Sequence, residues 1–430
     1  MSTNLFNPID KRKYPSRWSL YRGKQLFRVI DERSHEGTED LLSVSHITGI
    51  TPRSKKNVTM FKSESLIGYK LCQMGDIVAN TMWTWQGAIG VSKYEGVVSP
   101  AYNVYRQRKD YFNSTYLDML LREHQLVDVY HSLSTGIRPS RLRLYPDVFL
   151  TIEFPVPPRA EQDQIVRFLD WKVSEINKKR LLKKKSLELI RELISSAFEE
   201  LIHKSHEKVR LKRVVSLDDD FMNIVSDCYY QKAGMYNRAR GIFLRNPIKG
   251  SNMGDSKFQR IHRNRLMISG QFAWEDAVFV TSKKEEEGLA SHRYYLLKSR
   301  NKNFPVEYLF GYFISQKGFT DLQLCSHGSA GRNRPLNINE LLRVEIPIVH
   351  DTVAIAKFCR LIQAYMKMRP IVLREAALLD ELQNRIISDV VTGKIDVRNI
   401  PVPAYEHVDD LTADDGEDND EETGIPGEED

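Results

Sequence analysis

A repeat of about 190 residues divides most of this chain into two similar halves, and it constrains the fold more than any other feature of the sequence. Residues 149–155 (FLTIEFP) match residues 341–347 (LLRVEIP) at an offset of 192. Residues 76–78, followed by Trp85, match residues 265–267, followed by Trp274, at an offset of 189. Three further matches, with offsets of 191, 192 and 195, join 18–20 to 209–211, 98–102 to 290–294, and 134–136 to 329–331. Offsets this similar predict that the two halves fold alike.

Each copy begins with short β-prone segments bounded by Gly, Asn and Pro, which predicts a mixed α/β globule with several short strands. The expected strands are 75–79, 88–91 and 103–105 in the first copy, and 277–281 and 294–297 in the second. A helix is expected before a glycine loop in each copy, over 116–131 and 306–316. Trp85 and Trp274 occupy the same repeat position, and we expect both to pack in a core.

Each copy ends with a long helix whose apolar residues alternate at spacings of three and four, as in a coiled coil. Nine of the eleven positions in each stripe are apolar, and the fifth is Arg in both. The first stripe is Val166, Leu169, Val173, Ile176, Arg180, Lys183, Leu187, Ile190, Ile194, Ala197 and Leu201. The second is Ile355, Phe358, Ile362, Tyr365, Arg369, Val372, Ala376, Leu379, Gln383, Ile386 and Val390.

Two matching stripes in one chain predict that the helices pack on each other as an antiparallel coiled coil, because the globule between them must bring the chain back. The alternative is that each helix packs on its own globule. Pro370 lies inside the second helix, where it removes a backbone donor, and we expect a kink or a short break there. The predicted fold class is therefore α+β, with two tandem mixed α/β domains, each followed by a long helix.

The charge is distributed unevenly along the chain. Residues 399–430 contain 13 of the 57 acids and no Lys or Arg, so residues 1–398 combine all 63 basic residues with 44 acids and carry a net charge of +19. A body this basic favours a polyanionic partner such as nucleic acid. The acidic tail is too poor in apolar residues to fold, and we expect it to be disordered and to compete with DNA for the basic body.

The remaining composition suits a cytoplasmic protein. No apolar run approaches the length of about 20 residues that spans a bilayer, and the first 13 residues do not resemble a signal peptide. The four cysteines, Cys72, Cys228, Cys325 and Cys359, lie far apart and include no CxxC pair. This spacing argues against a disulfide framework or a zinc site.

The entry into the first long helix resembles that of the specificity (S) subunits of Type I restriction-modification enzymes. The resemblance rests on residues 154–166 (FPVPPRAEQDQIV), on residues 387–396 (ISDVVTGKID) at the end of the second helix, and on the order of globules and helices from about residue 15 to residue 398. The entry into the second helix, residues 347–352 (PIVHDT), departs from the pattern because it lacks Pro-Pro and Glu-Gln.

The resemblance implies two target-recognition domains, 1–158 and 205–350, and two spacer helices, 159–204 and 351–398, followed by a disordered acidic tail, 399–430. It also implies a non-catalytic DNA sequence-specificity subunit. Each domain would recognise half of a bipartite duplex target, and the helix pair would set the gap between the halves. The implied partners are two methyltransferase (modification) subunits and restriction/translocase subunits, which would use S-adenosylmethionine, ATP and Mg²⁺. This chain itself would bind no cofactor, metal or membrane.

The sequence lacks the motifs of the corresponding enzymes. An adenine methyltransferase needs an [ND]PP[FY] loop for the flipped base, but the one Pro-Pro pair, at 157–158, is followed by Arg159. No GxGxxG, GxxxxGK[ST] or HExxH motif occurs, and the PD…ExK pattern fails because Pro155 stands where Lys belongs. We therefore expect no catalytic site.

Candidate DNA contacts are Arg, Lys, Asn and Gln residues in turn-like segments, because these side chains can reach base edges and phosphates. In the first domain they are Arg53, Lys55, Lys56, Asn57, Gln86, Arg138 and Arg141. In the second they are Arg238, Arg240, Arg260, Arg263, Arg332, Asn333 and Arg334. Three alternatives remain open: a specificity subunit of a Type IIB-like system, a stand-alone DNA methyltransferase or nuclease, and a protein-only coiled-coil adaptor.

Overall fold

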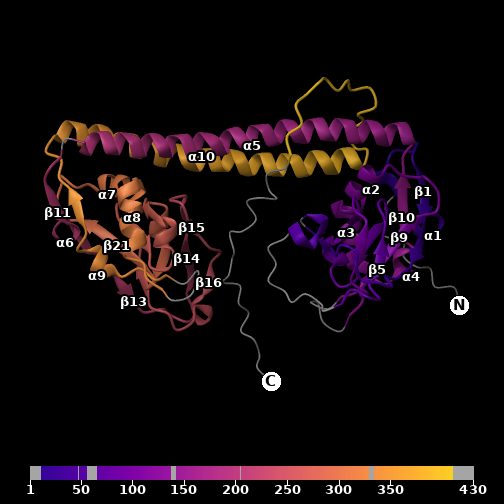
Figure 1. The fold of residues 1–430 in the computed structure, drawn as a ribbon, viewed down its shortest axis with the longest axis horizontal. Helices are drawn as coiled ribbons and strands as arrows, with labels where there is room; N and C mark the ends of the chain where they lie inside the picture. Colours follow the sequence, from indigo (N-terminus) through magenta and orange to yellow (C-terminus); the bar gives the residue numbers. More distant parts are fainter. Residues whose placement is uncertain are drawn as a thin grey trace. The chain divides into compact units, whose positions relative to one another are not determined.

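The fold is described by a computed structural model that covers residues 11–46, 48–55, 65–136, 142–203, 205–328 and 334–409 (Figure 1). The chain divides into two compact units. The first unit combines residues 1–181 with 376–430, and the second comprises residues 182–375. Each unit contains one α/β globule and part of each long helix, and each is described by itself.

The first globule is built on a four-stranded antiparallel sheet in the order β2-β9-β6-β7. Its strands are β2 (Phe27–Ile30), β9 (Tyr102–Gln107), β6 (Ile77–Asn80) and β7 (Ile89–Val91). Because successive side chains of a strand point to opposite faces, Ile77 and Ala79 join one apolar core and Val78 joins another. The first core also contains side chains of α2 (Ser114–Leu121) and α3 (His124–Leu133). The second contains side chains of β3 (Leu42–Ser45), β4 (Gly49–Pro52), β5 (Lys70–Cys72) and β8 (Gly96–Val98).

The second globule repeats this sheet in the order β12-β21-β18-β19. Its strands are β12 (Val215–Leu217), β21 (Tyr294–Ser299), β18 (Leu266–Ser269) and β19 (Val278–Val280), with α7 (Val306–Ile314) and α8 (Gln316–Leu324) packed in its main core. Leu266 and Ile268 face that core, whereas Met267 faces the opposite side. A further sheet contains β13 (Phe221–Met222), β14 (Tyr229–Tyr236), β15 (Gly241–Leu244), β16 (Ile248–Lys249), β17 (Phe258–Arg260) and β20 (Gly288–Ser291). The shared strand order confirms that two mixed α/β domains follow each other in the chain.

A two-stranded ribbon joins each globule to its long helix. In the first copy β1 (Ser19–Arg22) pairs with β10 (Glu153–Val156), flanked by α1 (Gly23–Leu26) and α4 (Pro146–Phe149). In the second, β11 (Lys208–Arg210) pairs with β22 (Glu345–Pro347), flanked by α6 (Leu211–Val214) and α9 (Ile338–Leu341).

The ribbon corrects one alignment made from the sequence. The amide of Gly23 donates to the carbonyl of Ile152 at 2.7 Å, and the amide of Leu211 donates to that of Val344 at 2.8 Å. Gly23 is therefore the structural counterpart of Leu211, at an offset of 188. The predicted match of Leu211 with Leu20 was wrong by three residues, because Leu20 lies in β1, where it pairs with Pro155.

The single helix predicted over 116–131 is in fact two helices, whereas the helix predicted over 306–316 corresponds to α7, and α8 was not predicted. Glu123 is extended between α2 and α3, and its carboxylate caps α3 by accepting a hydrogen bond of 2.7 Å from the amide of Gln125. Ser315 is extended between α7 and α8 in the same way, and its hydroxyl caps α8. The prediction missed the boundary at Glu123 because a cap inside an apolar pattern interrupts the backbone without interrupting the pattern.

The long helices are α5 (Arg159–Ile202) and α10 (Thr352–Val391), and they pack on each other in antiparallel fashion in both units. In the second unit, Lys183 pairs with Glu375 at 2.5 Å, and Phe198 contacts Phe358 with ring centroids 5.5 Å apart. In the first unit, Arg180 pairs with Asp380 at 2.9 Å. No position of either apolar stripe is exposed, which confirms the predicted coiled coil.

The predicted short break at Pro370 was wrong, because α10 runs without interruption through this residue. Pro370 itself is exposed, whereas Arg369 and Val372 on either side of it are buried. Packing of these neighbours holds the helix together where one backbone hydrogen bond is missing. No described helix is both long enough and apolar enough to cross a bilayer.

Candidate nucleic-acid interface

An exposed aromatic turn follows the central strand of the first globule. In this first aromatic turn, residues 81–87, the rings of Trp83 and Trp85 stack with centroids 6.2 Å apart. Trp83 is 45% exposed, and the indole of Trp85 donates to the carbonyl of Met82 at 2.8 Å. Gly87 closes the turn with a φ of +88°, a left-handed conformation that glycine adopts at low cost.

The second globule has an aromatic turn at the equivalent place. In this second aromatic turn, residues 270–276, Phe272 is 41% exposed and corresponds to Trp83 at an offset of 189. The indole of Trp274 donates to the carbonyl of Gln271 at 3.1 Å, as Trp85 does to Met82. Asp276 takes the position of Gly87, with a φ of +63°.

The placement of both tryptophans corrects a prediction. Trp85 and Trp274 were expected in the core, but both are only half-buried and lie in the surface turns. The residues that the sequence did not identify are Trp83 and Phe272, which are the more exposed aromatic residues of the two turns. Trp83 and Phe272 are separated by the repeat offset of 189, which could have identified them as equivalent surface residues. An aromatic residue at a repeated position is more often a core residue, and this expectation favoured the wrong interpretation.

The stem of the glycine loop lies against the aromatic turn in each globule. Leu144 donates its amide to the carbonyl of Thr81 at 3.2 Å, and Leu336 donates to that of Gly270 at 2.7 Å. The ring of Trp85 also lies 5.5 Å from that of His131. Of the candidate DNA contacts, Arg138, Arg141, Arg332 and Asn333 fall in the loops themselves and lie outside the described residues. The loops therefore begin and end beside the turns.

In the first globule, Arg53 lies at the same end of the sheet as the first aromatic turn. Arg53 follows β4 and is close to Tyr102, whose pKa is raised by burial against the opposing effect of the Arg53 charge. Tyr102 pairs with Asn80, the last residue of β6 before the turn. Gln86 is exposed within the turn itself. The backbone of Lys55 continues the short helix after Arg53, whereas its side chain, and all of Lys56 and Asn57, lie outside the described residues.

In the second globule, three of the predicted arginines gather at the second aromatic turn. Exposed Arg238 and Arg240 lie in the tight turn between β14 and β15, residues 237–240. The amide of Arg238 donates to the carbonyl of Glu275 at 2.8 Å, which holds this tight turn against the aromatic turn. The guanidinium of Arg334 lies 5.3 Å from the centre of the Trp274 ring. These residues therefore form a basic and aromatic surface in the second globule.

Arg260 and Arg263 do not join this surface. Arg260 lies on β17 and is 3.5 Å from the carboxylate of Asp220, and Arg263 is 4.0 Å from that of Glu286. Both precede β18, whereas the aromatic turn follows it, so they belong to the opposite end of that strand. The predicted contacts of the second globule therefore form two groups.

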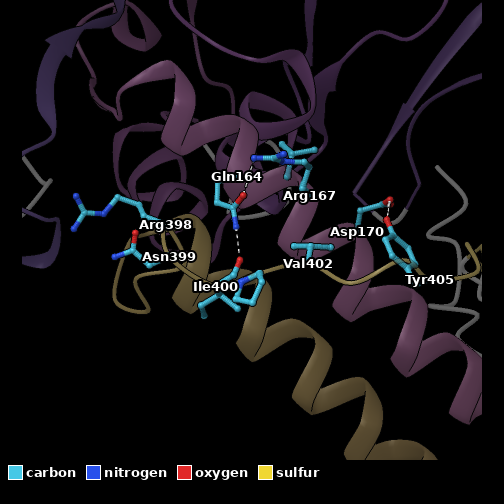
Figure 2. Close-up of a pocket in the computed structure, with 10 residues that line it drawn as sticks. Gln164, Arg167, Asp170, Arg398, Asn399, Ile400, Val402 and Tyr405 are labelled. Atoms are coloured by element: carbon cyan, nitrogen blue, oxygen red, sulfur yellow. Dashed lines mark hydrogen bonds between the residues drawn. The ribbon is translucent and has the colours of Figure 1, made fainter.

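A pocket of about 700 Å³ lies in the first unit, lined by residues of α5 and of the segment that follows α10 (Figure 2). It forms where the segment 396–409, here called the C-terminal strap, crosses α5. The amide of Gln164 donates to the carbonyls of Val397 and Ile400 at 3.1 and 2.8 Å, and the Tyr405 hydroxyl donates to Asp170. Farther along, Lys178 pairs with Glu406 at 3.4 Å. These contacts hold the C-terminal strap along α5.

The described residues contain no cluster of His, Cys, Asp and Glu that could hold a metal ion. No family model matches the chain, and no curated protein sequence matches it either.

The duplicated α/β globules and the antiparallel helices define a fold that resembles a solved chain of a type I R-M system. The chain is similar in fold to one solved to explain complex assembly and conformational transition of the type I R-M system, with a TM-score of 0.55 and 15% identity over 89% of this chain and 99% of that one.

Two further solved chains are also similar. The HsdS subunit from Thermoanaerobacter tengcongensis has a TM-score of 0.44 and 14% identity, over 89% of this chain and 98% of that one. The Type-I restriction-modification system S subunit from M. genitalium has a TM-score of 0.42 and 10% identity, over 90% of this chain and 99% of that one. At these identities the likeness concerns the fold.

Proposed function

We propose that this chain is the non-catalytic DNA-specificity subunit of a Type I restriction-modification enzyme. The observation that carries the proposal is the same exposed aromatic turn, with basic residues beside it, at the same end of the central sheet in both globules. Two similar surfaces in one chain suit a bipartite duplex target, of which each globule recognises one half. Type I specificity subunits provide the corresponding fold.

The chemistry of the two surfaces suits duplex DNA. Arginines such as Arg53, Arg238 and Arg334 can bind phosphates or guanine edges, and amides such as that of Gln86 can bind adenine edges. The net charge of +19 on residues 1–398 adds an attraction to the phosphate backbone that does not depend on sequence. A protein-only adaptor would need neither feature.

We further propose that partner subunits dock on the long helices. Outside the apolar stripe, α5 exposes Leu182, Leu189 and Leu193 in the second unit, at 59, 54 and 56%. In the first unit α10 exposes Leu378 and Leu382, which are one helical turn apart, at 44% each. Apolar side chains repeated along a helix face suit a protein partner. The partners would be two methyltransferase subunits and restriction/translocase subunits, and these would use S-adenosylmethionine, ATP and Mg²⁺, whereas this chain would bind no cofactor.

The test is to express the chain with its methyltransferase partner in a host that lacks other adenine methylation and to map methylated adenines across the genome. The expected result is a split motif with a fixed gap, which appears only when both proteins are present. Gel-shift titration of the same complex on a duplex that carries the motif should show specific binding. Methylation by this chain alone would indicate a stand-alone enzyme, and a complex that binds no duplex would indicate an adaptor.

A further inference from the structure

One contact of the second globule has no counterpart among the described residues of the first. Arg191 projects from α5, and its guanidinium donates to the carboxylate of Asp276 and, at 2.9 Å, to the carbonyl of Arg238. The two acceptors lie in different segments, because Asp276 ends the second aromatic turn and Arg238 lies in the tight turn between β14 and β15. One side chain of the helix therefore holds two surface turns at once.

Burial raises the cost of removing either partner of this contact. The side chain of Asp276 is 3% exposed and that of Arg191 is 32% exposed. A buried carboxylate without a cation is costly, and a planar guanidinium can satisfy two acceptors in a fixed geometry. A second arginine of the helix pair approaches the same region: Arg369 of α10 lies 5.4 Å from the centre of the Phe279 ring. A Cβ added to Gly241 would come within 2.4 Å of the Arg369 guanidinium, so this glycine leaves room for it.

The two turns are also joined directly to each other. The amides of Arg238 and Ala239 donate to the carbonyls of Glu275 and Asp276 at 2.8 and 2.7 Å. With Arg334 over the ring of Trp274, the basic and aromatic groups of this surface form one connected set of contacts that ends on Arg191. Movement of either turn would have to break the contact with α5.

The first globule lacks this connection. Gly87 stands at the position of Asp276 and has the same left-handed backbone but no carboxylate. A Cβ added there would meet Val127 of α3 at 3.4 Å, so this turn ends against its own globule. At this repeat position the two copies therefore differ by a carboxylate side chain.

We propose that Arg191 is a positioning residue for DNA recognition by the second globule, which fixes its basic and aromatic surface to the helix on which partner subunits would dock. The proposal rests on the proposed function and adds to it that recognition of one half-site depends on a residue of α5 outside both globules. Arg191 need not touch DNA for this effect.

The experiment maps methylation by the complex of this chain with its methyltransferase partner, for wild type and for Arg191→Met. The variant should lose about tenfold in discrimination at one half of the motif, the range expected when a single base-pair preference is lost, and should keep the other half unchanged. Arg334→Ala identifies the half read by the second globule, and both variants should relax the same half. Arg360→Met removes an exposed arginine of α10 in the same way and should leave both halves unchanged.

Two further variants distinguish a positioning role of Arg191 from a merely structural one. Arg191→Lys keeps the charge but not the two-pronged geometry, and it should restore discrimination in part. Asp276→Asn keeps a side chain that tolerates positive φ but neutralises the carboxylate, and it should relax the same half-site even if Arg191→Met does not fold. Amide exchange of residues 238 and 239 should be about tenfold faster in both Arg191→Met and Asp276→Asn, with no change in the first aromatic turn.

If Arg191→Met or Asp276→Asn kept wild-type discrimination at both half-sites, the inference would be overturned. Relaxation of both half-sites together would overturn it as well. Failure of the proposed function gives a different result, because the wild-type complex would then produce no split motif at all.

Discussion

The side chains that distinguish the two surfaces are few, and their neighbours suggest different roles. Trp274 anchors its turn by donating to Gln271, and its ring carries the guanidinium of Arg334. A cation over a tryptophan face is attracted by the ring and loses little freedom on binding a phosphate or a base. Phe272 and Trp83 have exposed rings and are free to meet a ligand. Arg334 is therefore the single side chain whose removal should affect DNA binding most clearly.

We expect Arg334→Ala to weaken binding to the split target by about 1–3 kcal/mol, because it removes a cation held at the centre of the proposed surface. Fluorescence titration of the complex on target and scrambled duplexes measures the change. Arg343→Ala, at an exposed position outside the surface, is the control and should alter neither affinity. Equal affinity of Arg334→Ala and wild type for the target would exclude Arg334 from the interface.

Part of the candidate site could be predicted residue by residue, and part could not. Gln86, Arg238, Arg240 and Arg334 were expected from basic or polar side chains in turn-like segments, and the structure places them beside aromatic turns. Arg191 could not be predicted as part of the second surface, because it lies in a long helix and is about 85 residues from its acceptor. Contacts between distant segments leave no local pattern in one sequence.

At the scale of elements, the helices were the most predictable part. Eleven positions at alternating spacings of three and four define each stripe, and this periodicity depends only on local geometry. The split of 116–131 into two helices was missed, because it depends on the single capping residue Glu123, and α8, which Ser315 caps, was not predicted. The pairing of strands in the sheets could not be predicted from the sequence, although the repeat indicated that both sheets would have the same topology.

Phe198 tests how much the packing of α5 stabilises the second unit. Its ring is fully buried, and the ring centroids of Phe358 in α10 and Tyr308 in α7 lie 5.5 and 5.2 Å from its own. Phe198→Ala should therefore destabilise this unit by about 3–5 kcal/mol, since it removes a large side chain and leaves a cavity.

Thermal unfolding followed by near-UV circular dichroism should show a lower transition temperature for Phe198→Ala. The matched control is Leu189→Ala on the same helix, where the side chain is 54% exposed and the loss should be small. Similar transition temperatures for wild type and Phe198→Ala would mean that α5 does not contribute to the core of the second unit.

At the scale of the whole molecule, the charge of the chain separates into a basic body and an acidic end. The C-terminal strap is fixed along α5, where Asn177 donates to the carbonyl of Val408 at 3.0 Å and Lys178 pairs with Glu406. The described end of the strap therefore lies beside Lys178, and eleven acids follow it in the sequence. Their sequence position gives them a high effective concentration at the basic body, which is the condition for competition with DNA.

Truncation after Asp409 tests this competition and leaves the described part of the strap in place. It removes eleven acids and no Lys or Arg, so the net charge rises from +6 to +17. Binding to non-specific duplex should become tighter, and the gain should shrink as salt increases, because the effect is electrostatic. Titrations at low and high salt measure the change in non-specific affinity. The control is a chain in which residues 410–430 are replaced by a tail of the same length made of neutral residues. Unchanged non-specific affinity would contradict a competing role for the tail.

The residue at the end of each aromatic turn has a practical consequence for building chimaeras. A foreign recognition domain in place of the first globule must keep other contacts with α5, such as that of the Asn113 amide with Gln162, but Gly87 requires no partner on this helix. Asp276 does, because its partner Arg191 precedes the globule in the chain. A graft that exchanges only the second globule would leave the guanidinium of Arg191 on the recipient helix without its carboxylate partner. The junction for such a transplant should therefore lie upstream of residue 191.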